Sequence, residues 1–414
     1  MMSSVIDLSA VLITISALFA YINHRFIGLP TTIGVMMVAL IASVLVYVAG
    51  LLGWADVQNQ ATSMLGEIDF NQTLLHGMLS FLLFAGALHV NLTDLKKQGW
   101  VILSLATVGV VMSTFLVGTA AYYLLAALSY HLPYLYCLLF GALISPTDPI
   151  AVMATVKRLG VSKELETTIA GESLFNDGVG VVVFMVLLIL LQQPESITPS
   201  HVAILFVEEA VGGLLLGTAL GLLGYYLMRS IDNYKVEVLL SLAIVMGGYS
   251  LAVALHTSGP IAIVVAGLIT GQVLRSEVLS DQTRRSLNEF WELVDEILNV
   301  VLFALIGLEV LIIPFEGQWF LASLFLIVIV IAIRFFSVGL PIRLIDWVTT
   351  RKLAPHLVKI LTWGGLRGGI SVALALSLPS GEYRDLILFL TYVIVVFSIV
   401  VQGLTIGPLI KRLS

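Results

Sequence analysis

Five charged side chains lie inside long apolar segments of this sequence: Asp148, Glu172, Asp177, Arg334 and Arg367. Such a residue near the bilayer centre costs about 2.5–3.5 kcal/mol on insertion scales, and it usually marks an ion or proton pathway. With both arginines protonated and all three acids ionised, the group carries one net negative charge. One Na+ or one H+ would neutralise that charge equally. A structural ion pair explains one such residue alone, but five on four segments favour a site where a monovalent cation and a proton alternate.

Asp148 lies in the stretch Ser145-Pro146-Thr147-Asp148-Pro149. Two prolines three positions apart remove two backbone donors and clash with preceding carbonyls, so a helix cannot continue through them. Broken backbone at membrane depth is tolerated only where protein buries it or where it lines a watery cavity. We therefore expect the freed Thr147 carbonyl and the Asp148 carboxylate to face a hard cation.

The second acidic stretch runs from Gly171 to Gly178 and contains four polar side chains. Ser173 and Asp177 are four positions apart and share a helix face, and Asn176 lies beside them. Glu172 points elsewhere, and Arg334 is its expected ion-pair partner. The predicted Na+ ligands are thus Asp148, Asp177, Ser173 and Thr147, with Asn176 also in the ion- and proton-binding group.

A third interrupted stretch, Gly364-Gly365-Leu366-Arg367-Gly368-Gly369, places one arginine among four glycines. Close packing of helices through small residues explains the glycines but not the arginine. We expect an unwound segment here. Arg367, together with Pro146 and Pro149, is predicted to support the site rather than to bind the ion.

The composition identifies the setting as a membrane. The 414 residues are 59% hydrophobic and 11% charged, whereas soluble domains carry roughly 25% charged residues. The chain lacks basic runs with interleaved aromatic residues, so nucleic acid is not an expected partner. The apolar segments contain no zinc motif, nucleophile elbow or His/Ser dyad. We expect an all-α integral membrane protein in contact with lipid, not an enzyme, without a cofactor other than transported Na+ and H+.

Apolar blocks of about 20 residues predict thirteen spans. Their approximate limits are 5–23, 29–53, 73–90, 100–127, 134–156, 165–191, 202–228, 236–255, 260–274, 290–313, 318–340, 357–378 and 385–410. Residues 54–72 are predicted to be an interfacial segment. With the N-terminus outside and the C-terminus in the cytoplasm, 17 of the 20 Lys and Arg residues fall on the cytoplasmic side, as the positive-inside rule requires. The expected location is the plasma (inner) membrane.

The interrupted spans are the fifth and the twelfth, seven apart. An odd offset in an alternating topology gives the two helices opposite orientations, which is the signature of inverted repeats around a midplane transport site. We predict a single membrane domain over 1–414, with repeat 1 at about 5–191, a linker span at about 202–228 and repeat 2 at about 236–410.

Taken together, these stretches resemble the NhaP branch of the monovalent cation:proton antiporters (cation:proton antiporter family 1), which are related to animal sodium/hydrogen exchangers. The resemblance covers most of the chain. Its motifs are the three stretches above together with Ser258-Gly259-Pro260, Ala266-Gly267-Leu268 and Gly307-Leu308-Glu309.

This resemblance implies thirteen helices in an NhaA/NhaP-like fold, a core domain that moves against a dimerisation domain, and a homodimer. It implies that Asp177 exchanges cation for proton with help from Asp148, Ser173 and the Thr147 carbonyl, and that Glu172 pairs with Arg334. The Asn-Asp order at 176–177 is similar to the electroneutral branch. The chain departs from some family members at Ala85, where they carry an acid.

The leading hypothesis is one-for-one exchange of Na+ (or Li+) for H+ by alternating access, in the service of pH homeostasis. K+/H+ exchange uses the same oxygens in a looser cage and remains open, and a cation channel is a third possibility. Four acids near the cytoplasmic end of the tenth span, Glu289, Glu292, Asp295 and Glu296, are interpreted either as a solvated helix end or as a funnel that concentrates cations.

Overall fold

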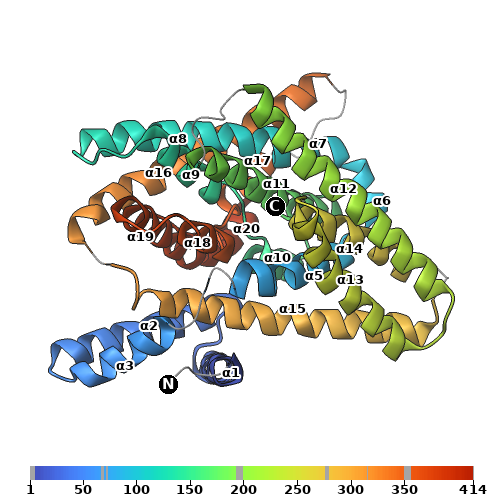
Figure 1. Cartoon of the computed structure of the whole chain (residues 1–414), viewed down its shortest axis with the longest axis horizontal. Coiled ribbons are helices and arrows are strands. Elements are labelled where there is room, and N and C mark those ends of the chain that lie inside the picture. The colour runs from blue at the N-terminus through green and yellow to red at the C-terminus, as the bar shows by residue number, and fades with distance from the viewer. Residues whose placement is uncertain are drawn as a thin grey trace.

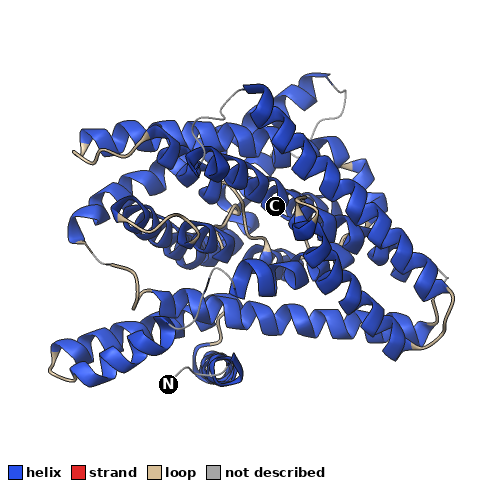
Figure 2. Ribbon diagram, in the orientation of Figure 1, coloured by secondary structure: helices blue, strands red, loops and turns tan. Residues whose placement is uncertain are grey.

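The computed structural model describes residues 5–66, 70, 73–192, 199–275, 279–314, 316–348 and 356–413. Within these residues the regular structure is helical, apart from one isolated β-bridge, and Figure 2 shows helices connected by short loops. The α-helices are α1 (Val5–Ile22), α2 (Thr31–Leu51), α3 (Ala55–Gly66), α5 (Leu79–His89), α6 (Leu92–Lys97), α7 (Gly99–Ser104), α8 (Val110–Ala127), α9 (Tyr134–Ile144), α10 (Ile150–Leu159), α11 (Lys163–Gln192), α12 (Pro199–Arg229), α13 (Tyr234–Ala254), α14 (Gly259–Arg275), α15 (Asp281–Glu309), α16 (Gly317–Val348), α17 (Leu357–Trp363), α18 (Gly369–Leu376), α19 (Glu382–Phe397) and α20 (Gly403–Leu413).

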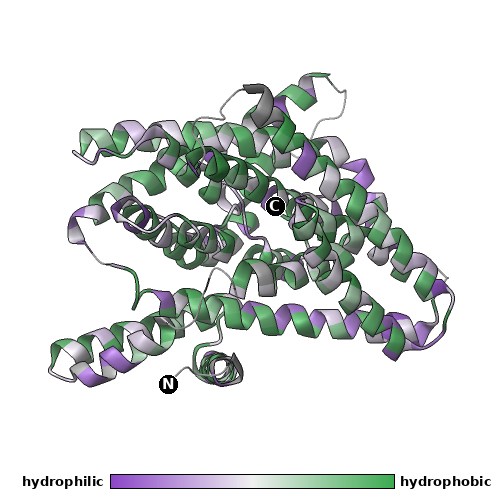
Figure 3. Ribbon diagram, viewed as in Figure 1, coloured by the Kyte–Doolittle hydropathy of each residue, from purple (hydrophilic) through white to green (hydrophobic). Residues whose placement is uncertain are grey.

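The all-helical membrane fold expected from composition is confirmed. Among the described residues, eight helical segments are long and apolar enough to cross a membrane. Large apolar side chains also cover outward surfaces, for example Leu215 on α12, Leu239 on α13 and Phe336 on α16. Figure 3 shows this apolar covering on the peripheral helices. Exposing so much apolar surface to water is energetically unfavourable, so this surface fits a lipid environment.

Each predicted span contains helical residues, and the two predicted interruptions are present. The fifth span is divided into α9 and α10, and the twelfth into α17 and α18. The predicted interfacial segment contains α3, while residues 67–69, 71 and 72 lie outside the described residues.

The helix of the tenth predicted span extends beyond that span, since α15 begins at Asp281 rather than at residue 290. The Ser280 side chain accepts a hydrogen bond from the Thr283 N–H and caps the helix, which favours its start there. The first turns of α15 are polar, so a search for apolar residues does not detect them. The short helix α6 was missed for the same reason, and the Asn91 side chain caps its start.

Two groups of helices surround α11. On one side α12, α13 and α14 pack together with α5, and on the other α8 packs against α9 and α16. The helix α11 contacts both α9 and α14, so it lies between the groups, as Figure 1 shows. The long helix α15 crosses beside α2, α5 and α13. This arrangement places the acidic stretch of α11 near the middle of the protein.

Glycines allow the backbones of α8 and α9 to touch. A Cβ atom on Gly141 would lie 2.2 Å from the Thr114 carbonyl oxygen, and one on Gly118 would lie 2.8 Å from the Cys137 carbonyl oxygen. Backbone atoms cannot move aside as a flexible side chain can. The contact therefore fixes the position of α9, which leads into the first interruption.

We predict that Gly141→Leu destabilises the protein, because overpacking a core costs about 1–3 kcal/mol even where only side chains must move. The apparent melting temperature in detergent should fall by about 1–3 °C or more. Gly247→Leu is the matched control, since a Cβ atom there meets nothing within 4 Å. Equal melting temperatures for the two variants would contradict the assigned contact.

Candidate functional site

The two interrupted helices cross each other at their unwound segments. The Asp148 N–H donates to the Leu366 carbonyl at 2.8 Å, which forms an isolated antiparallel bridge between the segments. One segment lies between Ile144 and Ile150, and the other between Trp363 and Gly369. The bridge satisfies one donor and one acceptor that the broken helices would otherwise leave free.

Arg367 stabilises the broken end of α9. Its Nη1 donates to the carbonyl oxygens of Ser145 at 2.6 Å and Pro146 at 3.0 Å, and its backbone N–H donates to the Ser398 hydroxyl at 2.9 Å. A cation is favourable at a helix C-terminus, where unpaired carbonyls carry partial negative charge. The structure therefore gives Arg367 a supporting place beside the site, with its charge directed to the backbone.

Asp148 is held between the two interruptions. The Ile150 N–H donates to its Oδ1 at 2.8 Å, and Pro149 directly precedes the first residue of α10. A Cβ atom on Gly368 would lie 2.5 Å from Asp148 Oδ2. Glycine at 368 thus leaves the room that this carboxylate occupies.

The helix α11 contributes a hydrogen-bonded group behind Asp148. The Asn176 Oδ1 accepts from the Thr147 N–H at 3.3 Å, while its Nδ2 donates to Thr147 Oγ1 at 2.8 Å and Glu172 Oε1 at 3.0 Å. The Thr147 and Ser173 hydroxyls are 3.2 Å apart. Asn176, which we expected in the ion-binding group, is engaged through both amide atoms and holds Thr147 in place.

Glu172 and Arg334 lie together, as their expected pairing requires. Arg334 Nη2 is 2.8 Å from the Glu172 carboxylate, and both side chains are buried. A Cβ atom on Gly365 would lie 2.7 Å from Arg334 Nε, so the second interruption also makes room for this guanidinium. A buried pair with added hydrogen bonds keeps each partner's charge compensated.

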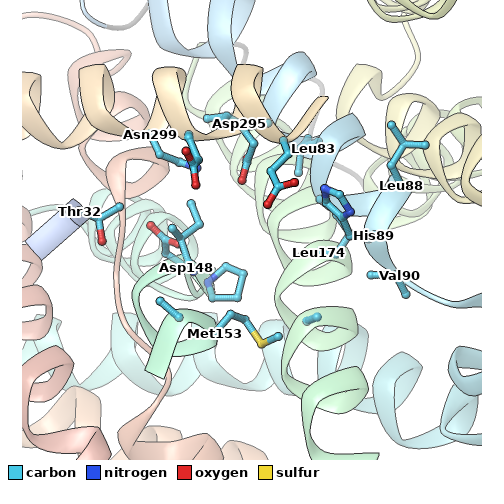
Figure 4. Close-up of a pocket in the computed structure, with 18 of the residues that line it drawn as sticks. Thr32, Leu83, Leu88, His89, Val90, Asp148, Met153, Leu174, Asp295 and Asn299 are labelled. Atoms are coloured by element: carbon cyan, nitrogen blue, oxygen red, sulfur yellow. The ribbon is translucent and has the colours of Figure 1, made fainter. Parts of the chain in front are cut away.

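Asp148 and Asp177 face one cavity of about 1270 Å³. Pro146 and Pro149 also line it, whereas Thr147, Ser173 and Asn176 lie behind its wall. Figure 4 shows Asp148 directed into this space opposite α15. Of the polar residues predicted to bind the ion, the two aspartates are thus the ones that this cavity reaches directly.

Some cavity residues were not predicted as part of the site. Asn299 and Ser371 line the cavity with Asp148 and Asp177, but an uncharged side chain within an apolar segment gives no signal in the sequence. Glu292, Asp295 and Glu296 line it as well, in agreement with the funnel interpretation, while Glu289 does not. Ala85 is fully buried on α5 outside the cavity wall and supplies no ligand.

The comparisons with known proteins agree on one family. The family described as "Sodium/hydrogen exchanger, transmembrane" matches residues 13–412. The chain is 51% identical over 410 residues to the Na+/H+ antiporter NhaP of Pseudomonas aeruginosa, covering 99% of this chain and 97% of that protein. It is 39% identical over 353 residues to the Na+/H+ antiporter NhaH of Halobacillus dabanensis, covering 83% and 84%.

A solved structure shares the fold. The sodium proton antiporter MjNhaP1 from Methanocaldococcus jannaschii, determined at pH 8, superposes with a TM-score of 0.75 at 19% sequence identity, covering 98% of this chain and 97% of that one. At this identity the match concerns the fold alone.

The buried pair leads to a stability prediction. Arg334→Met leaves Glu172 buried without its contacting countercharge, and breaking such a pair typically costs about 3–5 kcal/mol. The double variant Glu172→Gln/Arg334→Met carries no buried charge, so it should recover much of that loss. Melting temperatures of wild type, Glu172→Gln, Arg334→Met and the double variant in detergent form a double-mutant cycle. Additive effects of the two single substitutions would contradict a direct pair.

Proposed function

The chain belongs to the sodium/hydrogen exchanger family, and from this premise we propose that it is a secondary transporter that exchanges Na+ (or Li+) for H+ across the plasma membrane. The observation that carries the proposal is that Asp148 and Asp177, from an interrupted helix and from its neighbour α11, line the same cavity. Two carboxylates in a confined space bind one monovalent cation or take up a proton. The proposed protein is a transporter, not an enzyme, and needs no cofactor beyond the ions that it moves.

The proposed Na+ site contains Asp148, Asp177, Ser173 and Thr147. The aspartates supply charge at the cavity, and the hydroxyls of Ser173 and Thr147 lie together behind them. Hard cations prefer carboxylate, hydroxyl and carbonyl oxygens of this kind. Asn176 serves the site indirectly, because its hydrogen bonds hold the Thr147 segment on α11.

Charge balance supports one-for-one exchange without net charge movement. Arg334 neutralises Glu172 by direct contact, and the remaining charged groups are Arg367 and the two aspartates. With these ionised, the group is one positive charge short of neutrality. One Na+ or one H+ removes this deficit, and a neutral loaded site crosses a low-dielectric barrier at much lower cost than a charged one.

The side of the membrane to which the cavity opens supports an inward-facing state. Lys157, Arg158, Lys163, Arg275 and Arg284 line the cavity, and they belong to the loops and helix ends that the positive-inside rule assigns to the cytoplasm. We place the N-terminus outside and the C-terminus in the cytoplasm, with thirteen spans in two inverted repeats. Movement of the crossed helices against α12–α15 would then expose the site to the other side.

A homodimer is part of the proposal. It is supported by the family resemblance, and exposed apolar residues on α12 and α13 leave surface for lipid or for a second copy.

The function is tested in liposomes that contain the purified protein and an internal pH dye. Addition of Na+ or Li+ outside should move protons, and clamping the membrane voltage should leave the rate unchanged. Asp177→Asn should reduce the exchange at least about 100-fold, to background, because the titrating carboxylate is lost. Glu208→Gln, an exposed acid on α12, is the control and should retain full exchange.

Three results would reject parts of the proposal. Wild-type exchange by Asp177→Asn would remove the assigned role of that carboxylate. A response to K+ equal to the response to Na+ would favour K+/H+ exchange. Cation current without proton movement would favour a channel.

A further inference from the structure

Among the residues that the structure describes, two buried oxygens at the cavity have no hydrogen-bond partner. Asn299 Oδ1 on α15 and Ser371 Oγ on α18 are unpaired, their residues are 3% and 1% exposed, and both residues line the cavity. A buried acceptor without a partner costs about 1–3 kcal/mol. In a native protein such a group calls for an explanation, and an unseen ligand is one.

The neighbour of the Asn299 amide favours one orientation. The Asp295 carboxylate lies one turn earlier on α15 and interacts with the Asn299 side chain. A carboxylate only accepts hydrogen bonds, which favours the Asn299 nitrogen on the side of Asp295 and leaves Oδ1 as the unpartnered atom. Figure 4 shows Asp295 and Asn299 projecting from α15 toward the space in front of Asp148.

The crossed helices bring Ser371 to the same end of the cavity. A Cβ atom on Gly369 would lie 2.5 Å from Leu302 Cδ1, so the first turn of α18 rests directly on α15, less than one turn beyond Asn299. The preceding residue, Gly368, lies against Asp148. Asp148, the first turn of α18 and the Asn299 turn of α15 therefore meet at one point.

The chemistry of these groups suits a partly hydrated monovalent cation. One carboxylate, one amide oxygen and one hydroxyl are oxygen donors with a single negative charge between them. Asp295 and Asp148 line the same cavity, so a cation between them is attracted by both carboxylates. Both free oxygens are covered by the cavity wall, so the two side chains must turn toward the cavity before they can contact an ion between α15 and α18.

We propose that Asp295, Asn299 and Ser371 form a transit site, which a Na+ or Li+ ion occupies on its way between the cavity mouth and the Asp148–Asp177 pair. This inference rests on the proposed exchange function and extends it. The transit site is selective for the cation step, because the proton reaches the aspartates through water and needs no oxygen cage. Its residues speed capture and release of the cation without forming the final site.

The test compares the two substrates of exchange. In proteoliposomes, Asn299→Leu and Ser371→Ala should each lower kcat/KM for Na+ about fivefold or more, as expected when a steering group for an ion is removed. The value of kcat/KM for H+ should stay within about twofold of wild type. A purely structural role would lower both values together. Gln282→Leu, an exposed amide on the same helix, is the control and should change neither value.

A conservative variant tests the chemistry itself. Asn299→Ser keeps an oxygen at the position and should recover part of the lost kcat/KM for Na+, whereas Asn299→Leu should not. If Asn299→Leu fails to fold, Ser371→Ala carries the test alone, because it removes only one oxygen. Wild-type kcat/KM for Na+ in Ser371→Ala, or an equal loss for Na+ and H+, overturns the transit site. If Asp177→Asn still abolishes exchange in the same assay, that failure leaves the proposed function intact.

Discussion

The crossing of two interrupted helices is the interaction on which the rest of the site depends. One backbone hydrogen bond joins Asp148 to Leu366, and Arg367 donates to two carbonyl oxygens at the broken end of α9. Unsatisfied backbone groups cost several kcal/mol each in a bilayer, so a chain can unwind there only if other protein groups replace the lost bonds. At the crossing, groups of each interrupted helix replace hydrogen bonds that the other helix has lost. It also sets the Asp148 carboxylate at the cavity, where Gly368 leaves it room.

This geometry gives the charged side chains different roles. Glu172 and Arg334 form a closed pair, and Asn176 links that pair to Thr147. Arg367 is committed to backbone carbonyls. Of the five charged side chains within the apolar segments, the two that remain open to the cavity are Asp148 and Asp177. The fixed groups thus provide a rigid, balanced frame, and the change in charge during transport is confined to two carboxylates.

Much of this arrangement follows from the sequence, because its causes are local or are set by charge. Pro146 and Pro149 break a helix wherever they occur, and arginine among glycines in an apolar segment requires an unusual environment. The Glu172–Arg334 contact could be predicted since a charge buried in a membrane needs an opposite one. The start of α15 could not, because its first turns are polar and amphipathic.

Other features depend on tertiary contacts between distant segments. The sequence around Arg367 does not reveal that it donates to the Ser145 and Pro146 carbonyls, over 200 positions away. The sequence around Asn176 likewise does not reveal that both of its amide atoms form hydrogen bonds with protein groups. Asn299 and Ser371 are ordinary polar residues in their own helices. Only the packing of α18 on α15 makes their free oxygens part of the cavity wall.

The central claim is that Na+ and H+ compete for the same pair of aspartates. The most direct measurement is the apparent KM for Na+ as a function of pH, in proteoliposomes with equal pH on both sides. Competition for one site predicts that, on the acidic side of the profile, KM rises about tenfold for each unit that the pH falls, while the rate at saturating Na+ is unchanged. A KM that does not depend on pH, with a maximal rate that falls instead, would show that the proton acts elsewhere and would contradict the account.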